Sequence, residues 1–182
     1  MIITSTFIDG LKIIQPKVFG DNRGFFYESY NSKQMFEFGL NMNFVQDSHS
    51  LSVGGVLRGV HVQKNFPQGK LVRCIRGKIW DVAVDLRKES ETFGKWFGLE
   101  LSSENKKQLY IPEDFGHGFL VLSDEAEVCF KVTDYYHPGD EIGFIWNDPD
   151  VGIEWPIPLG MKIILADKDK KWQTLNEIFP EI

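Results

Sequence analysis

Short runs of apolar residues, separated by glycine and polar positions, recur along most of the chain. In the run Lys78–Leu86 the even-numbered residues from position 80 onward are all apolar, whereas Asp81 and Asp85 lie on the opposite face. A repeat of two residues is that of a β-strand, because successive side chains alternate between its faces. The pattern predicts an all-β domain, a sandwich or barrel of many short strands.

The same alternation, or a short apolar run, predicts strands elsewhere in the chain. Gly77 and Lys78 offer a tight turn after Leu71–Arg76, which predicts that this run and the next one form a hairpin. The remaining predicted strands are Leu11–Val18, Gly24–Tyr30, Val56–Gln63, Trp96–Leu101, Gln108–Ile111, Gly118–Leu122 and Glu127–Tyr136.

One short helix is predicted among the strands, at Ser32–Phe38, where Asn31 or Ser32 can cap its start and Gly39 ends it. The chain of 182 residues suffices for one domain with a sizeable core. Because no repeat or low-complexity linker divides it, residues 1–182 are predicted to form a single domain. The charged stretch Asp167–Lys171 is typical of a surface turn.

Composition limits the classes of function. The net charge of -6 excludes a global basic field that would attract nucleic acid. The apolar runs are too short to span a bilayer, and the first residues lack the pattern of a secretory signal. Cys74 and Cys129 form no Cys-x-x-Cys pattern, so disulfide staples are not expected. We therefore expect a cytoplasmic protein that binds neither nucleic acid nor membrane.

The histidines argue against a metal site. A protein metal centre usually needs several imidazoles at short spacing, such as a His-x-His pair on one strand. His61 is followed by Val62 and Gln63, and His117 stands alone between two glycines. No metal ligand set is predicted from this pattern.

Arg58 and His61 lie close together in a strand-like run. Strict alternation points them to opposite faces, but a β-bulge at Gly59 would re-aim one of them, a device frequent beside active sites. Taken singly, a strand histidine is more often structural than catalytic, and Arg58 and Lys70 are more often exposed to solvent. Against this, Lys70 and Arg73 stand on a run that is otherwise apolar.

Six motifs in register make the chain recognisable. They are Phe19–Phe26 (FGDNRGFF), Phe44–Asp47 (FVQD), Val56–His61 (VLRGVH), Gln68–Cys74 (QGKLVRC), Ile111–Phe119 (IPEDFGHGF) and Gly152–Pro156 (GIEWP). Each is weak alone, but together they resemble the dTDP-4-dehydrorhamnose 3,5-epimerase family over nearly the whole chain.

The resemblance implies a cupin-type jelly roll that uses neither a metal nor an organic cofactor. It also implies a homodimer formed through exchanged N-terminal strands. The substrate would be a nucleotide-diphosphate sugar, a thymidine-diphosphate 4-keto-6-deoxyhexose, used in making deoxysugars for surface polysaccharides. A proton beside the C4 carbonyl is removed to give an enolate and is returned from the other face.

Site residues follow from the resemblance as well. Matching positions make His61 the base, Asp169 the residue that orients it, and Lys70 the cation near the enolate oxygen. So weak a carbon acid gives up its proton only if fixed donors or cations stabilise the charge that develops on the carbonyl oxygen. The positions that correspond to substrate binding are Arg23, Glu28, Gln46, Ser48, Arg58, His117, Phe130, Tyr136, Glu141 and Lys168.

Two positions depart from the family pattern. Ser48 stands in place of an asparagine, which shortens one polar arm toward the nucleotide. Phe130 stands in place of the tyrosine that donates a proton to the enolate, and its ring has no proton to give. Epimerisation at both C3 and C5 is one outcome, with water or a phenol such as Tyr135 as the donor. Epimerisation at a single centre is the other.

Two further classes of function compete with an epimerase. One is a sugar-nucleotide-binding cupin without catalysis, but a binding protein has no need of the set His61, Lys70 and Asp169. The other is a metal-dependent cupin oxygenase, against which the scarcity of histidines argues. The sequence therefore predicts a sugar-nucleotide epimerase.

Overall fold

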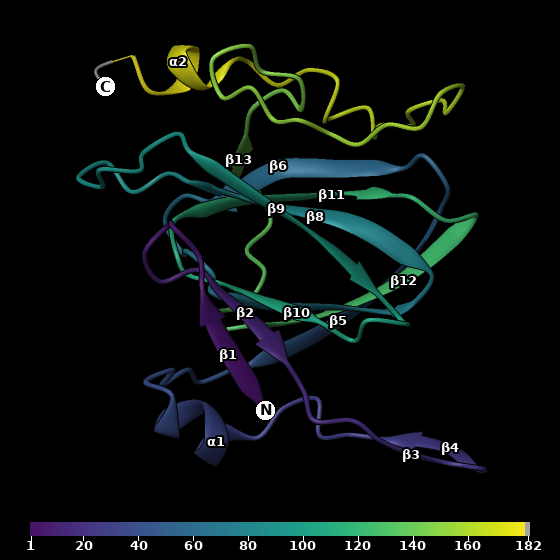
Figure 1. Cartoon of the computed structure of the whole chain (residues 1–182). Helices are drawn as coiled ribbons and strands as arrows, with labels where there is room; N and C mark the ends of the chain where they lie inside the picture. Colours follow the sequence, from purple (N-terminus) through teal and green to yellow (C-terminus); the bar gives the residue numbers. More distant parts are fainter. Residues whose placement is uncertain (181–182) are drawn as a thin grey trace.

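Two facing antiparallel sheets form the body of the molecule (Figure 1). The structure, a computed structural model, describes residues 1–180. Within them, the six-stranded sheet has the order β1 (Ile2–Ser5), β2 (Lys12–Gln15), β10 (Gln108–Ile111), β7 (Lys70–Arg76), β12 (Glu125–Val132) and β5 (Gln46–Val53). The five-stranded sheet has the order β13 (Glu141–Gly143), β6 (Leu57–Gln63), β11 (Phe115–Val121), β8 (Lys78–Asp85) and β9 (Trp96–Ser102).

This architecture confirms the predicted all-β jelly roll. A small hairpin of β3 (Phe19–Asp21) and β4 (Gly24–Phe26) extends away from the two sheets (Figure 1). The helices of the described residues are short: α1 (Ser32–Glu37), capped by Asn31, one of the two predicted caps, and α2 (Leu175–Ile178). Among residues 1–180 no helix has the length and apolar character needed to cross a membrane.

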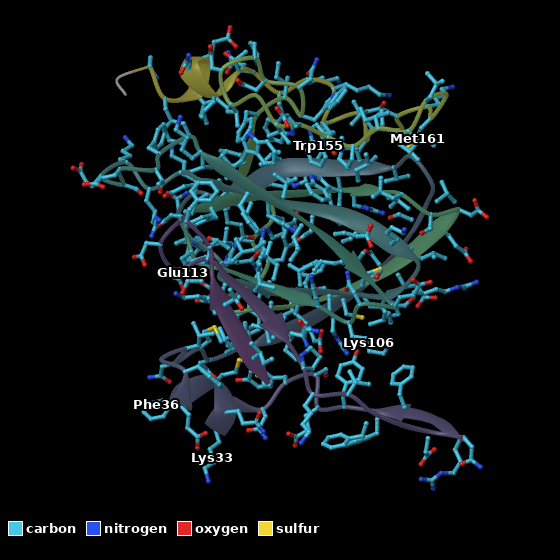
Figure 2. The ribbon with its side chains drawn as sticks, in the orientation of Figure 1. Lys33, Phe36, Lys106, Glu113, Trp155 and Met161 are labelled. Atoms are coloured by element: carbon cyan, nitrogen blue, oxygen red, sulfur yellow. The ribbon has the colours of Figure 1, made fainter. Side chains whose placement is uncertain are left out.

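Apolar side chains fill the interior between the two sheets. Val72 and Val128 of the six-stranded sheet meet Ala83 and Phe119 of the five-stranded sheet in one buried cluster. The outer face of the five-stranded sheet is covered in turn by the C-terminal part of the chain, in which Trp155 lies (Figure 2). The five-stranded sheet is therefore buried on both faces.

The predicted hairpin at Gly77 is wrong. The strand before it, β7, pairs with β10 and β12, whereas the strand after it, β8, pairs with β9 and β11 in the other sheet. Gly77, with φ of 72°, turns the chain from one sheet into the other, and a Cβ there would lie 2.1 Å from the carbonyl oxygen of Glu125. The turn itself was located correctly, but a local pattern does not distinguish a hairpin from a corner between sheets.

Several strands were not predicted, namely β1, β3, β5 and β13, and α2 was missed too. The case of β5 has a physical cause: its inward positions are Gln46, Ser48, Ser50 and Ser52, while apolar Leu51 and Val53 face outward. The usual rule of apolar side chains inward is reversed on this strand. The predicted strand at Glu127–Tyr136 ends at Val132.

A bulge at Gly59 confirms the sequence expectation and brings Arg58 and His61 to the same face. His117 and Phe119 are two positions apart on β11, whereas their partners on β6, His61 and Arg58, are three positions apart. Gly59 takes φ of 109°, and the neighbouring backbone is so close that a Cβ would lie 2.6 Å from the His117 carbonyl oxygen. Only glycine meets both demands without strain.

We expect Gly59→Ala to lower the free energy of unfolding by about 2–5 kcal/mol, through backbone strain and collision with β11. Gly139→Ala is the matched control, because Gly139 also has a positive φ, 88°, but no neighbouring atom lies within 4 Å of the place that its Cβ would take. Urea unfolding of both variants measures the difference. Equal decreases in the free energy of unfolding would mean that the close approach of β6 and β11 does not contribute to the cost of a side chain at Gly59.

Candidate active site

The inner face of the six-stranded sheet carries four of the predicted site residues. In the strand register Gln46 and Lys70 both lie opposite Val132, and Ser48 lies opposite Phe130. Neighbouring residues on this face, such as Val128, belong to the core between the sheets. Gln46, Ser48, Lys70 and Phe130 therefore point toward the five-stranded sheet.

Two histidines come from the facing sheet. His61 on β6 and His117 on β11 are direct cross-strand partners, so their side chains lie next to each other on the same face. Both are largely buried, with side chains 18% and 10% exposed. Sequence-distant residues are thus gathered on two facing surfaces.

A buried carboxylate contacts each imidazole. His61 Nε2 lies 2.9 Å from Asp169 Oδ1, and His117 Nε2 lies 2.8 Å from Asp81 Oδ1. Asp169 is 2% exposed and Asp81 is fully buried. Because an ionised carboxylate only accepts hydrogen bonds, each pair fixes the Nε2–H tautomer of its neutral imidazole and supports the imidazolium once it forms.

The other nitrogen of His61 faces a second carboxylate. Glu141 Oε1 on β13 lies 3.2 Å from His61 Nδ1, and the same carboxylate forms an ion pair with Lys168. Glu141 and Lys168, both predicted as binding residues, are thereby placed directly at the proposed base.

Trp172, which sequence reasoning missed, contacts the Asp169 carboxylate. Its indole Nε1 donates to Asp169 Oδ1 at 3.2 Å, and its ring packs against Gly143 of β13. Burial raises the pKa of Asp169, but the hydrogen bonds from His61 and Trp172 and the nearby cations hold it below the ordinary value. The carboxylate is therefore kept ionised beside His61.

Lys70 lies near both histidine–carboxylate pairs. Burial lowers the pKa of its ammonium to about 8, against the opposing pull of Glu141 and Asp81, the carboxylates in contact with His61 and His117. A cation of this kind is suited to stabilising an oxygen that gains negative charge.

Two other predicted residues, Arg58 and Tyr136, also border this region. Arg58 donates from Nε and Nη2 to Ser52 Oγ, at 3.0 and 2.9 Å, and so reaches from β6 to β5. Gln46 accepts from the backbone N–H of Tyr136, whose exposed ring follows the end of β12. These contacts leave an aromatic ring and a guanidinium available at the margin of the site.

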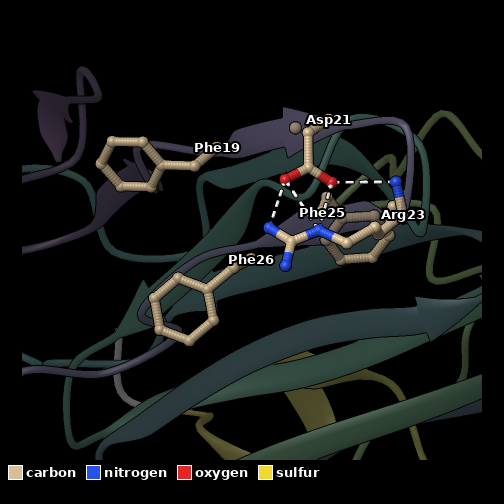
Figure 3. A pocket seen from close by; sticks show the side chains of 7 residues that line it. Phe19, Asp21, Arg23, Phe25 and Phe26 are labelled. Carbon is tan, nitrogen blue, oxygen red and sulfur yellow. Dashed lines mark hydrogen bonds and ion pairs between the residues drawn. The ribbon is translucent and has the colours of Figure 1, made fainter.

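Arg23 and Glu28 do not lie with the others. Arg23 sits in the β3–β4 hairpin, 86% exposed, where it pairs with Asp21 beside the exposed rings of Phe19, Phe25 and Phe26 (Figure 3). Glu28 accepts hydrogen bonds from Asn31 and Gln34 at the start of α1. Within one chain, neither residue is part of the site around His61.

Metal ligand geometry is also lacking in residues 1–180, where no group of three or more His, Cys, Asp and Glu side chains is arranged to hold an ion.

Asp81 is the second residue that sequence reasoning missed. It alternates with apolar residues on β8, and the one available signal was an aspartate opposite an apolar stripe on a strand buried on both faces. That signal becomes clear only once both covering layers are known.

The fold and the site together define a cupin-type barrel with an interior suited to proton transfer: two imidazoles, each in contact with a carboxylate, face the buried ammonium of Lys70. The comparisons with known proteins agree. The family model described as dTDP-4-dehydrorhamnose 3,5-epimerase matches residues 5–177. The chain belongs to this family and is a sugar-nucleotide epimerase.

Individual relatives are similar over nearly their whole length. The dTDP-4-dehydrorhamnose 3,5-epimerase of Methanothermobacter thermautotrophicus is 53% identical over 94% of this chain and 93% of its own. That of Escherichia coli is 51% identical over 98% and 96%. A solved structure of the Legionella pneumophila dTDP-6-deoxy-D-glucose-3,5-epimerase, in complex with dTDP-4-keto-L-rhamnose, has 51% identity and a TM-score of 0.93, covering 97% and 93%.

We expect Trp172→Phe to lower turnover by about tenfold, because a hydrogen bond to a charged group contributes about 1.5–3 kcal/mol. With one donor lost, the pKa of Asp169 rises, so activity also begins to fall at a higher pH on the acid side. Trp155→Phe is the matched control, since its indole donates to the Trp146 carbonyl oxygen instead of to Asp169. A pH–rate profile that is the same for both variants would exclude a role of Trp172 at the His61–Asp169 pair.

Proposed function

We propose that this enzyme inverts both C3 and C5 of a dTDP-linked 4-keto-6-deoxyhexose through enolate intermediates, with His61 as the base. The observation that carries the proposal is the buried Asp169 carboxylate on His61 Nε2. Relatives that are 53% and 51% identical are named 3,5-epimerases, which supports action at both carbons, and neither a single-centre epimerase nor a binding protein without catalysis is favoured.

The contact between His61 and Asp169 determines which imidazole nitrogen of His61 accepts the substrate proton. Since Asp169 holds the proton on Nε2, the lone pair on Nδ1 of His61 is the one that takes the substrate proton. Glu141 lies at that nitrogen in the structure, paired with Lys168. The Glu141 carboxylate therefore turns away toward Lys168 when the sugar enters.

The positive charge of Lys70 then lowers the free energy of the enolate. As the carbon–hydrogen bond breaks, negative charge moves to the C4 oxygen, where the Lys70 ammonium stabilises it. Arg58 suits the diphosphate, because a guanidinium binds anionic oxygens through two parallel hydrogen bonds. Tyr136 suits stacking on the nucleotide base from its exposed position after β12.

His61→Ala is expected to abolish exchange of the C3 and C5 protons with solvent, while the nucleotide still binds. Asp169→Asn is expected to slow exchange by about 10–100-fold, because it disturbs the tautomer of His61 and leaves the acceptor in place. Proton NMR in deuterated water with the dTDP-4-keto sugar measures the exchange. Near-normal exchange in His61→Ala would show that another residue is the base.

The proposal includes a homodimer in which each hairpin of β3 and β4 reaches the partner subunit. The exposed fractions of Phe19, Phe25 and Phe26, 55%, 62% and 67%, favour such burial, since isolated chains rarely leave three large rings together in solvent. An exchanged hairpin would also explain why Arg23, matched to a substrate position, lies outside its own chain's site.

The proposal also places the enzyme in the cytoplasm. Two free thiols, on Cys74 and Cys129, fit this reducing compartment.

Mixing two inactive variants tests the exchange. If Arg23 acts in the partner's site, heterodimers of Arg23→Ala and His61→Ala subunits contain one site with both side chains. After subunits are mixed by unfolding and refolding, activity should return to about a quarter of the wild-type value, because half of the dimers are mixed and half of their sites are intact. Absence of any recovery, with dimers verified by sedimentation, would place Arg23 in its own chain's site, and full activity of Arg23→Ala alone would place it outside the mechanism.

A further inference from the structure

Inversion requires a proton donor on the face of the sugar opposite the base. His61 belongs to the five-stranded sheet, so a sugar held between the sheets must receive its new proton from the six-stranded sheet. His117 does not meet this condition, because it is the cross-strand neighbour of His61 on the same face. A proton from His117 would return to the side from which it was taken.

Few groups on the facing sheet carry an exchangeable proton of suitable acidity. Phe130 carries none. Cys74, on the same face, is buried, its thiol donates to the Arg76 carbonyl oxygen, and burial raises its pKa to about 11. The hydroxyls of Ser48, Ser50 and Ser52 are far weaker acids than an ammonium. Lys70 remains.

The tyrosines do not supply the missing phenol from an inward strand position. Tyr110 of β10 pairs with Leu71 and packs in the cluster beside α1, on the outer side of the sheet. Tyr135 and Tyr136 follow the end of β12 and are 58% and 54% exposed. The last two are Tyr27, beside the exposed ring of Phe25, and Tyr30, packed on Phe44.

We propose that Lys70 is the acid of this enzyme, delivering a proton from its ammonium to the enolate on the face opposite His61. The proposal rests on the epimerase function and on the base assigned above. Lys70 lies within electrostatic reach of Glu141 and Asp81, and no hydrogen bond among residues 1–180 engages its Nζ. Its lowered pKa, about 8, makes it a readier donor than an ordinary lysine.

The proton balance closes. His61 takes the proton as the carbon–hydrogen bond breaks and its electron pair passes into the enolate. An N–H bond of Lys70 then breaks, a carbon–hydrogen bond forms on the other face, and the carbonyl is restored. Lys70 is left as an amine and His61 as an imidazolium, and each exchanges one proton with solvent. Because C3 and C5 both flank C4, a donor beside the C4 oxygen serves either carbon.

Lys70→Arg separates this role from charge stabilisation. Arginine keeps the positive charge but does not release its proton, so His61 can still remove and return a proton on one face. In deuterated water we expect label to enter C3 and C5 of the unchanged substrate at a rate within about tenfold of wild type, while inverted product falls by ~100-fold or more. Lys131→Arg, on the outward side of β12 and paired with Asp47, is the control and should leave both rates unchanged.

The double variant Lys70→Arg, Phe130→Tyr provides the converse test, because a phenol would again face His61 from β12. Inversion should recover by at least about tenfold over Lys70→Arg, which also shows that the arginine variant is folded. Unchanged inversion in Lys70→Arg, or parallel loss of exchange and inversion without rescue, would overturn the proposal. If the wild-type enzyme neither exchanges nor inverts, the proposed function itself fails.

Discussion

The close approach of β6 and β11 at Gly59 determines how the site is assembled. Each of the two strands also pairs with another strand on its other side, and the sheet is covered on both faces. The bulge in β6 therefore has no room for a side chain at Gly59. With glycine there, His61 comes to lie beside His117 while Arg58 still reaches Ser52 on the opposite sheet. An unbulged strand would send one of these two side chains out of the interior.

The covering layer on the outer face of the five-stranded sheet contributes residues to the candidate site as well as to the apolar core. Leu175 and Phe144 are buried in its apolar cluster, and the intervening chain carries Asp169 and Trp172 to His61. Residues more than a hundred positions apart meet only when this layer is packed. Apolar burial of the C-terminal part of the chain therefore sets the position of the carboxylate, which loops alone would hold less firmly.

Alternation and motif order predicted most strands, the helix α1 and the jelly roll, because strongly periodic segments carry their own structural signal. The site residues that depended on the family motifs, such as His61, Asp169, Glu141 and Lys168, do lie in contact. What local patterns could not predict depends on long-range geometry: the sheet that follows Gly77, the polar strand β5, the burial of Asp81, and the distance of Arg23 from its own site. The first three depend on which surface another part of the chain covers, and the proposed exchange of hairpins between subunits would account for the last.

The polar interior has an energetic consequence. Ser50 Oγ and Asp81 Oδ2 are buried without a hydrogen-bond partner among the described residues, and a core of apolar side chains would avoid that cost of desolvation. The same inward positions on β5, occupied by serine and glutamine, are those that face the two histidines across the interior. A sugar with hydroxyl and carbonyl groups offers the donors and acceptors that such groups lack. The chain thus loses some stability at the place where a polar ligand can supply the hydrogen-bond partners.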